Sequence, residues 1–312
     1  MEPGAQISAV MVSYRTGPVL FESIRAVLAD PDIRELILVN HDNPTNVTVR
    51  LDTLDAAEPR LRVIHTGENL GFARGCNIGA RAASGNLLLF LNPDTLIGRG
   101  TAALMANTVK DLDVPAIAGA RILNPDGSEQ RGARRGDLTL MSAALSFSGL
   151  ARLLPGLRDF HRERETVPST AVEVPSVSGA AMMMTRASYR RLNGFDERYF
   201  LHVEDLDICK RTWRAGGKVV FEPRASLVHL GSTSHVNVLF VEWHKAAGLR
   251  RYFAAHATTL ERSVLWLVNP LMTLAILARA VTLRTRTRVI EARQRMRARA
   301  RLAQRRRDAG NS

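Results

Sequence analysis

Short apolar runs alternate with segments of helical periodicity in the first third of the chain. Apolar runs of strand length are typical of buried strands, whereas apolar positions three and four residues apart indicate helices with one buried face. The expected strands cover residues 7–12, 36–39, 61–65 and 86–91, and the expected helices cover 19–29, 46–57 and 71–83. This alternation predicts an α/β fold of right-handed βαβ units, with helices flanking a mixed, mainly parallel sheet.

Polar clusters follow three of the expected strands directly. Ser13-Tyr14 comes after the first strand, His41-Asp42-Asn43 after the second, and Asn92-Pro93-Asp94 after the fourth. Ligands of parallel α/β sheets bind at the carboxyl ends of the strands, so these clusters predict a binding site at one edge of the sheet. Pro93 cannot continue a strand ladder, which puts Asp94 in a loop.

The middle of the chain has a less regular pattern. Asn124-Pro125-Asp126-Gly127 predicts a hairpin turn that leads into a mobile basic loop over 131–135. Residues 138–157 are apolar and loosely amphipathic, and a further strand is expected near 172–178.

The chain changes character after Leu260. Residues 263–278 are uncharged and apolar apart from an interruption at Asn269-Pro270. As a helix this stretch would be about 24 Å long, shorter than the roughly 30 Å hydrocarbon core of a bilayer. Residues 279–312 hold twelve arginines against two acids, which accounts for +10 of the net charge of +13. The high pI therefore belongs to this tail.

An apolar segment beside a polybasic one favours an interfacial or re-entrant segment at an anionic membrane surface, where each cation contributes roughly 1 kcal/mol. A pair of packed core helices is the alternative for 263–278. Nucleic acid is an unlikely partner because no aromatic residue lies among the tail arginines to stack on bases. We expect one domain over 1–255 and a helical, apolar-then-basic, membrane-associating tail over 256–312.

Composition adds little about the class but bears on location. Apolar content of 46% and charged content of 23% are ordinary for a soluble α/β protein. Cys76 and Cys209 lack metal-ligand spacing, so a reducing compartment fits better than a disulfide framework. No charged segment followed by an apolar one resembles a secretory signal at the N-terminus. We expect a cytoplasmic protein, peripheral on the cytoplasmic face of the inner membrane.

Acidic residues distant in sequence indicate group-transfer chemistry. Transfer of a sugar from a nucleoside diphosphate needs a divalent cation at the departing diphosphate and a carboxylate that takes the proton of the acceptor hydroxyl. Asp94, after an apolar run, fits the cation site; a turn or helix-capping aspartate is the ordinary alternative. His229 can complete this site as a neutral imidazole, although a lone histidine is more often structural.

Glu204, Asp205 and Asp207 fit the second role. Three carboxylates within four residues repel one another, and they open a helix-like stretch whose positive end favours them. The alternative is simply an acidic first turn of a structural helix.

Together these clusters resemble the family 2 glycosyltransferases, particularly the rhamnosyltransferase-like branch that builds bacterial surface polysaccharides. The similarity covers roughly 6–235 and lies in the order and spacing of segments that are each weak alone. The segments are Val12-Ser13-Tyr14, Asp42-Asn43, Asn69-Leu70-Gly71-Phe72-Ala73-Arg74-Gly75-Cys76-Asn77, Leu91-Asn92-Pro93-Asp94, Ser178-Gly179-Ala180, Gly194-Phe195-Asp196-Glu197-Arg198-Tyr199-Phe200, Glu204-Asp205-Leu206-Asp207 and Val228-His229.

The resemblance implies a GT-A fold with a nucleotide-sugar half over about 1–125 and an acceptor half over about 126–255. Tyr14 and Asp42 would line the nucleoside pocket, with Asp42 hydrogen-bonded to the pyrimidine. Gly71 would let the backbone approach the nucleotide closely. The implied nucleotide- or substrate-binding residues are Ser13, Tyr14, Asp42, Asn69, Gly71, Arg74, Asn77, Asn92, Arg131 and Asp207.

The resemblance also implies roles for the acidic residues. Asn92-Pro93-Asp94 is similar to the family's DXD motif, so Asp94 would bind Mg²⁺ or Mn²⁺, with His229 as second ligand. Asp205 looks like the general base and Glu204 would support it, making these two the catalytic residues. Asp207 would orient neighbouring backbone or Arg211.

The sequence departs from the family pattern in two places. Asn92 replaces the first acid of the DXD motif, so metal binding rests on Asp94, water and the diphosphate. Pro44-Thr45-Asn46-Val47 lacks the usual second acidic residue, which bears on ribose recognition. The loop 131–135 either closes over the diphosphate or is merely solvated, and 138–157 either faces a lipid-linked acceptor or packs in the core.

The expected activity is metal-dependent, inverting transfer of a sugar, rhamnose or another hexose. The donor is a UDP- or dTDP-sugar, and the acceptor is a glycan or a polyprenyl-diphosphate-linked glycan in cell-surface polysaccharide synthesis. The alternative is a catalytically silent, nucleotide-binding scaffold of a polysaccharide assembly complex. The presence of Asp94, Asp205 and His229 together argues against the scaffold.

Overall fold

The computed structural model describes residues 6–148, 160–231, 237–258 and 261–265. The strands are β1 (Ile7–Ser13), β2 (Ile33–Asn40), β3 (Leu61–His65), β4 (Leu87–Leu91), β5 (Thr95–Ile97), β6 (Ala116–Leu123), β7 (Arg134–Arg135), β8 (Val172–Glu173), β9 (Ser176–Val177), β10 (Ala181–Thr185) and β11 (Lys218–His229). The helices are α1 (Val19–Leu28), α2 (Thr45–Ala57), α3 (Phe72–Ala82), α4 (Thr101–Val109), α5 (Leu140–Ser148), α6 (Arg186–Arg191), α7 (Glu204–Arg214) and α8 (Val238–His256). The strands and helices expected before residue 92 are confirmed, with ends that differ by a few residues.

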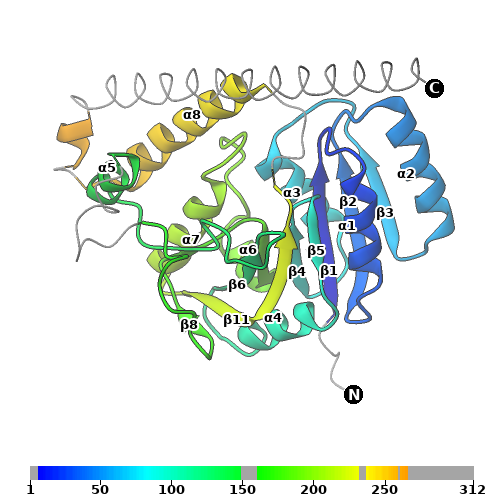
Figure 1. The fold of residues 1–312 in the computed structure, drawn as a ribbon, viewed down its shortest axis with the longest axis horizontal. Helices are drawn as coiled ribbons and strands as arrows, with labels where there is room; N and C mark the ends of the chain where they lie inside the picture. The colour runs from blue at the N-terminus through cyan, green and yellow to red at the C-terminus, as the bar shows by residue number, and fades with distance from the viewer. Residues whose placement is uncertain (1–5, 149–159, 232–236, 259–260, 266–312) are drawn as a thin grey trace, which may run out of the picture.

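A nine-stranded mixed sheet forms the centre of the fold (Figure 1), in the order β3-β2-β1-β4-β10-β6-β11-β5, with β8 beside β11. The strands β1, β2, β3 and β4 pair in parallel, as βαβ units require. β10 lies antiparallel between β4 and β6, so its first residues sit at the carboxyl end of β4. β11 runs parallel to β6 and antiparallel to the short β5.

Alternate residues of the central strands face two separate cores. Ala9 and Met11 of β1 pack with apolar residues of α1 and α4, whereas Val10 and Val12 pack with α3 on the other face. All four side chains are buried, which explains why residues 9–12 of β1 form a continuous apolar run and not an alternating one.

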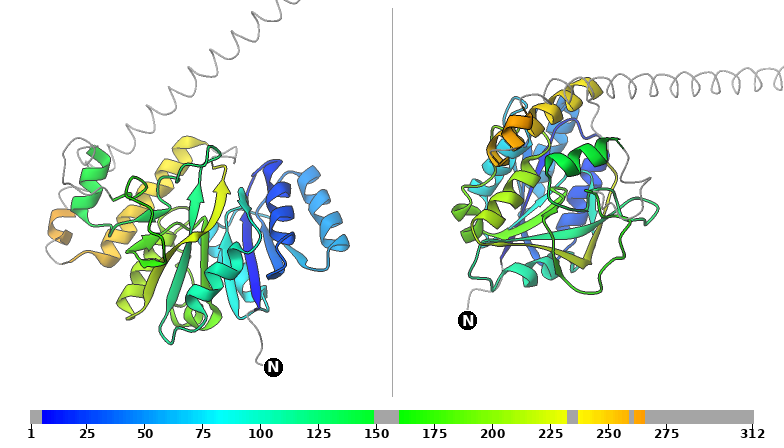
Figure 2. Two further views of the ribbon diagram at one scale, coloured as in Figure 1. Left: turned by 60° about the horizontal axis from the view of Figure 1, so that its bottom comes forward. Right: turned by 90° about the vertical axis from the view of Figure 1, so that its left-hand side faces the viewer.

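A third apolar cluster joins α5, α7 and α8. In both views of Figure 2, α5 and α8 lie together at one end of the molecule. Leu138 and Ala143 are buried in this cluster, while Met141 on α5 is 69% exposed. Core packing therefore holds for part of the 138–157 segment, of which residues 149–157 lie outside the described range.

The predicted hairpin turn at 124–127 is confirmed. The prediction of a mobile basic loop after it is wrong for Arg134 and Arg135. The N–H of Gly127 donates to the carbonyl of Asn124 at 2.9 Å. Arg134 is buried and donates to Glu129 at 2.8 Å. Arg135 lies in β7, which pairs with β9. A guanidinium group has five donors and can be buried wherever carboxylate and carbonyl oxygens surround it.

The expected strand near 172–178 is present as the two short strands β8 and β9. Most of the apolar stretch 263–278, and all of the arginine-rich stretch after it, lie outside the described residues. Among the described residues no helix is long and apolar enough to cross a membrane.

Asp207 ties α7 to α8. Its carboxylate accepts hydrogen bonds from Arg211 at 2.7 Å and from His256 at 2.8 Å, and the hydroxyl of Tyr199 lies 3.3 Å away. Burial would raise the pKa of Asp207, but the hydrogen bond from His256 and the charge of Arg211 hold it below its ordinary value. The expected contact with Arg211 is present, and these bonds within the fold favour the supporting role over substrate binding.

We predict that Asp207→Ala lowers the free energy of unfolding by about 3 kcal/mol, because it removes the shared partner of a buried network. Urea unfolding followed by circular dichroism measures this loss. The matched control is Asp52→Ala, whose carboxylate is 58% exposed beside His65 and should contribute less than about 1 kcal/mol. Equal losses in the two variants would contradict the prediction.

Candidate active site

The polar clusters that follow β1 and β2 meet at one edge of the sheet, as expected. The amide of Asn43 donates to the hydroxyl of Ser13 at 3.0 Å and to its carbonyl oxygen at 3.2 Å. The N–H of His41 donates to the same carbonyl at 2.8 Å. Ser13 and Asn43 are both buried, so they shape the floor of this edge.

Gly71 brings the loop before α3 against the loop that precedes α7. Its φ is +87°, and a Cβ at this position would lie 2.6 Å from the carbonyl oxygen of Phe200. The N–H of Phe72 donates to that oxygen at 2.8 Å, and the side chain of Asn69 accepts the N–H of Gly71 at 3.1 Å. Only glycine fits here, and Asn69 fixes the loop on which it lies.

The two residues expected in the nucleoside pocket are neighbours of Arg15. Arg15 donates to Asp42 at 3.2 Å, and its guanidinium lies 5.2 Å from the centre of the Tyr14 ring. Asp42 has a φ of 46°. The contact with Arg15 was not expected from the sequence, where this arginine is one charge in a polar loop.

His41 joins the end of β2 to the Gly71 loop. One ring nitrogen lies 2.7 Å from the hydroxyl of Thr66 and the other 3.2 Å from the carbonyl of Gly71. Burial lowers the pKa of His41, so the ring is neutral near pH 7. His41 belongs to the polar cluster expected after the second strand. Its contact with the loop at Gly71 depends on tertiary packing that local sequence does not reveal.

Asn77 has contacts that favour a structural role over the expected nucleotide binding. It is buried, and its amide donates to the carbonyl of Phe195 at 2.9 Å and to Glu197 at 3.0 Å. Its oxygen accepts from the N–H of Phe195 at 3.0 Å and from the hydroxyl of Tyr189. Arg74, on the same helix, is half-exposed, with its Nε 3.7 Å from Glu197.

Asp94 and His229 lie side by side. The antiparallel pairing of β5 with β11 sets His229 opposite Thr95, and the N–H of Leu230 donates to the carbonyl of Asp94 at 3.0 Å. The Nε2 atom of His229 is 3.0 Å from Oδ1 of Asp94 and 3.2 Å from Nδ2 of Asn92. Asn92 and Asp94, both named from the sequence, therefore lie beside the same ring nitrogen of His229.

This pair fits a divalent cation with a mixed oxygen and nitrogen donor set. Asp94 is 6% exposed, and its carboxylate lies close enough to the imidazole nitrogen of His229 for both groups to bind the same cation. The described residues contain no group of three or more His, Cys, Asp and Glu side chains that could hold a metal. A cation held by Asp94 and His229 would complete its shell with water and with the donor's phosphates, as Mg²⁺ commonly does.

Asp205 lies in the first turn of α7 and is ionised. Its carboxylate accepts the N–H of Gly179 at 3.0 Å and the N–H of Leu206 at 2.8 Å, and it pairs with Arg135. Burial would raise the pKa of Asp205, but the charge and hydrogen bond of Arg135 hold it below its ordinary value. Arg135 thus contacts the expected base and was not expected there.

Glu204 has the opposite electrostatics. Its side chain is buried, and Oε2 has no hydrogen-bond partner among the described residues. Burial and the neighbouring charge of Asp205 raise the pKa of Glu204 to about 8. At neutral pH one carboxyl group is protonated and the next is charged, so Asp205 is the one able to accept a proton.

The helix that carries both carboxyl groups begins with unusual backbone geometry. His202 and Val203 have φ values of 66° and 75°, in the left-handed region that non-glycine residues rarely adopt. A β-branched residue such as Val203 is costly there, and such strain is typical of functional sites. Gly248 on α8 packs against this turn, where a Cβ added to it would lie 3.1 Å from the carbonyl oxygen of His202 and 3.2 Å from the side chain of Val203.

Arg131 follows Gln130 on the loop after the hairpin turn. It donates to the hydroxyl of Ser146 on α5 at 3.4 Å. Its expected place over the donor's diphosphate stays a prediction.

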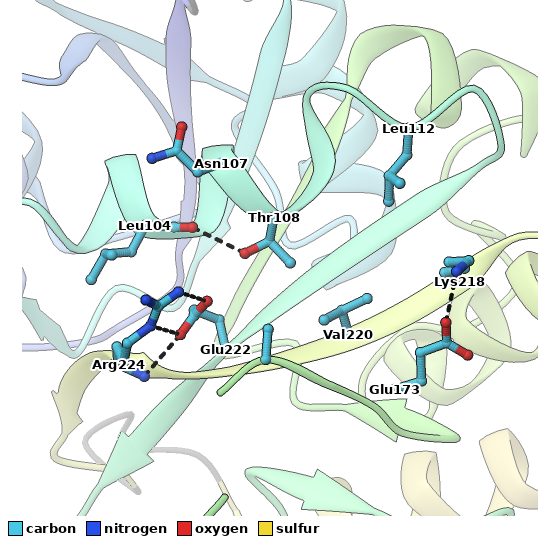
Figure 3. A pocket seen from close by; sticks show the side chains of 10 residues that line it. Leu104, Asn107, Thr108, Leu112, Glu173, Lys218, Val220, Glu222 and Arg224 are labelled. Atoms are coloured by element: carbon cyan, nitrogen blue, oxygen red, sulfur yellow. Dashed lines mark hydrogen bonds and ion pairs between the residues drawn. The ribbon is translucent and has the colours of Figure 1, made fainter. Parts of the chain in front are cut away.

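A hollow elsewhere on the molecule has no comparable chemistry (Figure 3). It lies between α4 and the first half of β11, whereas His229 is the last residue of that strand. Its charged residues are paired with each other, Lys218 with Glu173 at 2.9 Å and Arg224 with Glu222 at 2.8 Å. The strand-end site is therefore the better candidate.

Solved structures of low sequence identity share the fold. A mannosyltransferase from Pyrobaculum calidifontis, solved with GDP-mannose and Mn²⁺, has a TM-score of 0.57 at 14% identity, over 92% of this chain and 80% of its own. GalNAc-T7, solved with UDP, GalNAc and Mn²⁺, has a TM-score of 0.55 at 17% identity, over 72% of this chain but only 43% of its own. The fold is that of a GT-A glycosyltransferase.

The family follows from the sequence comparison. The model described as glycosyl transferase family 2 matches residues 8–192, more than half of the chain, and the chain belongs to this family. A second model, the N-terminal domain of galactosyltransferase, matches residues 163–236. A similar curated protein is the N-acetylglucosaminyl-diphospho-decaprenol L-rhamnosyltransferase of Mycobacterium tuberculosis, 24% identical over 72% of this chain and 75% of that protein.

We predict that Glu204→Gln flattens the pH dependence of stability. The folded protein keeps the proton of Glu204 up to about pH 8, whereas the unfolded chain loses it near the ordinary value of 4.5. The free energy of unfolding therefore falls as pH rises through this window. The variant should gain stability relative to the wild type between pH 5 and pH 8.

Urea unfolding of both proteins at pH 5, 6, 7 and 8 measures this difference. Glu68→Gln, at an exposed position, is the control and should follow the wild type. Parallel curves for Glu204→Gln and the wild type would refute the assignment of a buried, protonated carboxyl group.

Proposed function

We propose that the protein is an inverting, metal-dependent glycosyltransferase of cell-surface polysaccharide synthesis. It would transfer rhamnose or another hexose from a UDP- or dTDP-sugar to a glycan or polyprenyl-diphosphate-linked acceptor. The observation that carries the proposal is one loop that contacts both acidic motifs. The carbonyl of Ala180 accepts the N–H of Asn92 at 3.0 Å, and the N–H of Gly179 donates to Asp205 at 3.0 Å.

The relatives support the substrate classes. The similar mycobacterial protein is named as a rhamnosyltransferase, and its name gives an acceptor that is a sugar on a polyprenyl diphosphate. The two proteins of similar fold were solved with UDP or GDP-mannose and with Mn²⁺. A nucleoside-diphosphate sugar and a divalent cation are therefore the first substrates and cofactor to test.

On the donor side, one set of residues would bind the nucleoside and another would bind the diphosphate. Tyr14 and Asp42 would hold the base, and the backbone at Gly71 would lie close to the nucleotide, with its loop fixed by Asn69. A cation bound by Asp94 and His229 would neutralise the charge that develops on the departing diphosphate.

On the acceptor side, Asp205 would take the proton of the attacking hydroxyl. Its ionised state suits this role, although the contact with Arg135 weakens its basicity, so Arg135 must yield part of this contact to the acceptor. The hydroxyl oxygen bonds to the anomeric carbon as the bond to the diphosphate breaks, and the electron pair leaves with the nucleotide. This single displacement inverts the configuration. The protonated Glu204 can donate a hydrogen bond that orients the acceptor.

We predict donor-dependent nucleotide release by the purified protein in a screen of UDP-, dTDP- and GDP-sugars, with and without a lipid-linked acceptor. EDTA should abolish release. Asp205→Asn should lower turnover by about 10²- to 10⁴-fold, the usual contribution of a general base, while nucleotide affinity is retained. The control is Asp137→Asn, which removes an outer carboxylate paired with Lys210 at 2.8 Å.

Near-normal turnover in Asp205→Asn would remove this residue from the base role. Nucleotide binding without release for any donor and acceptor would favour the silent scaffold instead.

We further propose that the protein is cytoplasmic and attaches to the cytoplasmic face of the inner membrane through residues 256–312. The net charge of +10 over 279–312 supports an anionic surface as partner. We predict that the full chain sediments with anionic vesicles at low salt and that a chain ending at Thr259 does not. Equal sedimentation of both, or no binding by the full chain, would refute this role of the tail.

A further inference from the structure

Gln130 holds His229 from the side opposite Asp94. The Nδ1 atom of His229 lies 2.6 Å from Oε1 of Gln130. The amide nitrogen of Gln130 donates to the carbonyl oxygen of His229 at 3.1 Å and to the side-chain oxygen of Asn124 at 3.1 Å. Every polar atom of the Gln130 side chain is therefore used, and two of the three contacts are to His229.

These contacts fix which end of the Gln130 amide faces the imidazole. A backbone carbonyl can only accept a hydrogen bond, so the atom of Gln130 that faces the carbonyl of His229 must be the NH₂ group. The other end of the amide, Oε1, is then the atom beside Nδ1. Since an amide oxygen has no hydrogen to give, Nδ1 of His229 must carry the proton of this bond.

The state of Nδ1 determines what the ring offers to Asp94. In a neutral imidazole only one nitrogen carries a hydrogen, so a protonated Nδ1 leaves a lone pair on Nε2. This lone pair lies 3.0 Å from the carboxylate oxygen of Asp94. Two acceptors at this distance repel each other unless a cation or a second proton lies between them. In the other tautomer, Nε2 would donate to Asp94 and the pair would be an ordinary structural hydrogen bond.

We propose that Gln130 is a positioning residue that selects the Nδ1-protonated tautomer of His229 and so presents Nε2, with Asp94, to a divalent cation. The inference rests on the proposed function only for the cation; the tautomer is a property of the metal-free protein. Support of this kind for a ligating histidine, through its second nitrogen, commonly changes metal affinity by 10- to 100-fold.

The hairpin after β6 is what carries Gln130 to His229. Leu123 and Glu129 form a bridge across the turn, and the N–H of Gln130 donates to the carbonyl of Ile122 at 2.8 Å. Because β11 runs parallel to β6, with Val228 opposite Leu123, the residue that returns from the turn lies next to His229. The turn therefore has a use beyond reversing the chain.

The first test is the tautomer itself, read from long-range ¹H–¹⁵N spectra of the ¹⁵N-labelled, metal-free protein at pH 8. His229→Asn assigns the signals. We expect a protonated Nδ1 in the wild type, loss of this preference in Gln130→Leu, and its retention in Gln130→Glu, which keeps an acceptor for Nδ1. A protonated Nε2 in the wild type overturns the inference, whatever the variants do.

The second test is binding of Mn²⁺ alone, followed by electron paramagnetic resonance. Gln130→Leu should weaken Mn²⁺ binding by about 10- to 100-fold, and Gln130→Glu should restore most of it. Asn124→Ala is the matched control, because it removes one partner of Gln130 but leaves the bonds to His229. Asp94→Ala, which removes the carboxylate ligand, should lose binding.

The two tests separate the possible failures. A protonated Nδ1 in a wild-type protein that binds no Mn²⁺ overturns the cation site of the proposed function and the cation half of this inference, while the tautomer stands. Unchanged Mn²⁺ affinity in Gln130→Leu, with wild-type affinity measurable, overturns the positioning role alone. Circular dichroism melting curves verify that the variants are folded, and the wild-type tautomer needs no variant.

Discussion

Two backbone groups at the start of β10 hold the candidate site together. Ala180 accepts the N–H of Asn92, and Gly179 donates to Asp205, so neighbouring residues contact the loop after β4 and the first turn of α7. This arrangement depends on the direction of β10. Because it runs antiparallel between β4 and β6, its first residues reach the edge where the parallel strands end. A parallel strand there would bring its other end to the site.

The same loop lets two adjacent carboxyl groups have opposite charge states. Asp205 receives the N–H of Gly179 and the guanidinium of Arg135, and these donors compensate its burial. Glu204 is equally enclosed, but its Oε2 has no hydrogen-bond partner within the described part of the chain. Burial raises the pKa of Glu204, and the charge of Asp205 raises it further. Separate environments, and not residue type, thus leave one carboxyl group charged and the other protonated, as the proposed roles of base and hydrogen-bond donor require.

Sequence periodicity was sufficient for the elements before residue 92, since most of them bury a local apolar pattern, although α2 buries only Leu51. The residue types alone allowed His229 to complete a site with Asp94, and the family resemblance gave the pair its expected role. Local sequence could not show that the two residues meet, because the pairing of β5 with β11 brings them together. Arg135 looked like one cation in a solvated loop, and only its pairing with Asp205 reveals its burial. Gln130 carried no local signal except its place just after a predicted turn; recognising it requires the β6–β11 pairing.

Asn92 and Gln130 both affect how much the imidazole of His229 would contribute to binding a cation. Asn92 stands where the family's DXD motif has its first acid, so the proposed cation site would have one carboxylate. A larger share of the binding energy would then come from the imidazole of His229. A lone pair on Nε2 then matters more than it would beside two acids. The amide of Asn92, 3.2 Å from Nε2, can donate to that lone pair in the metal-free protein. A site with fewer charges therefore depends more strongly on the hydrogen bond that orients its neutral ligand.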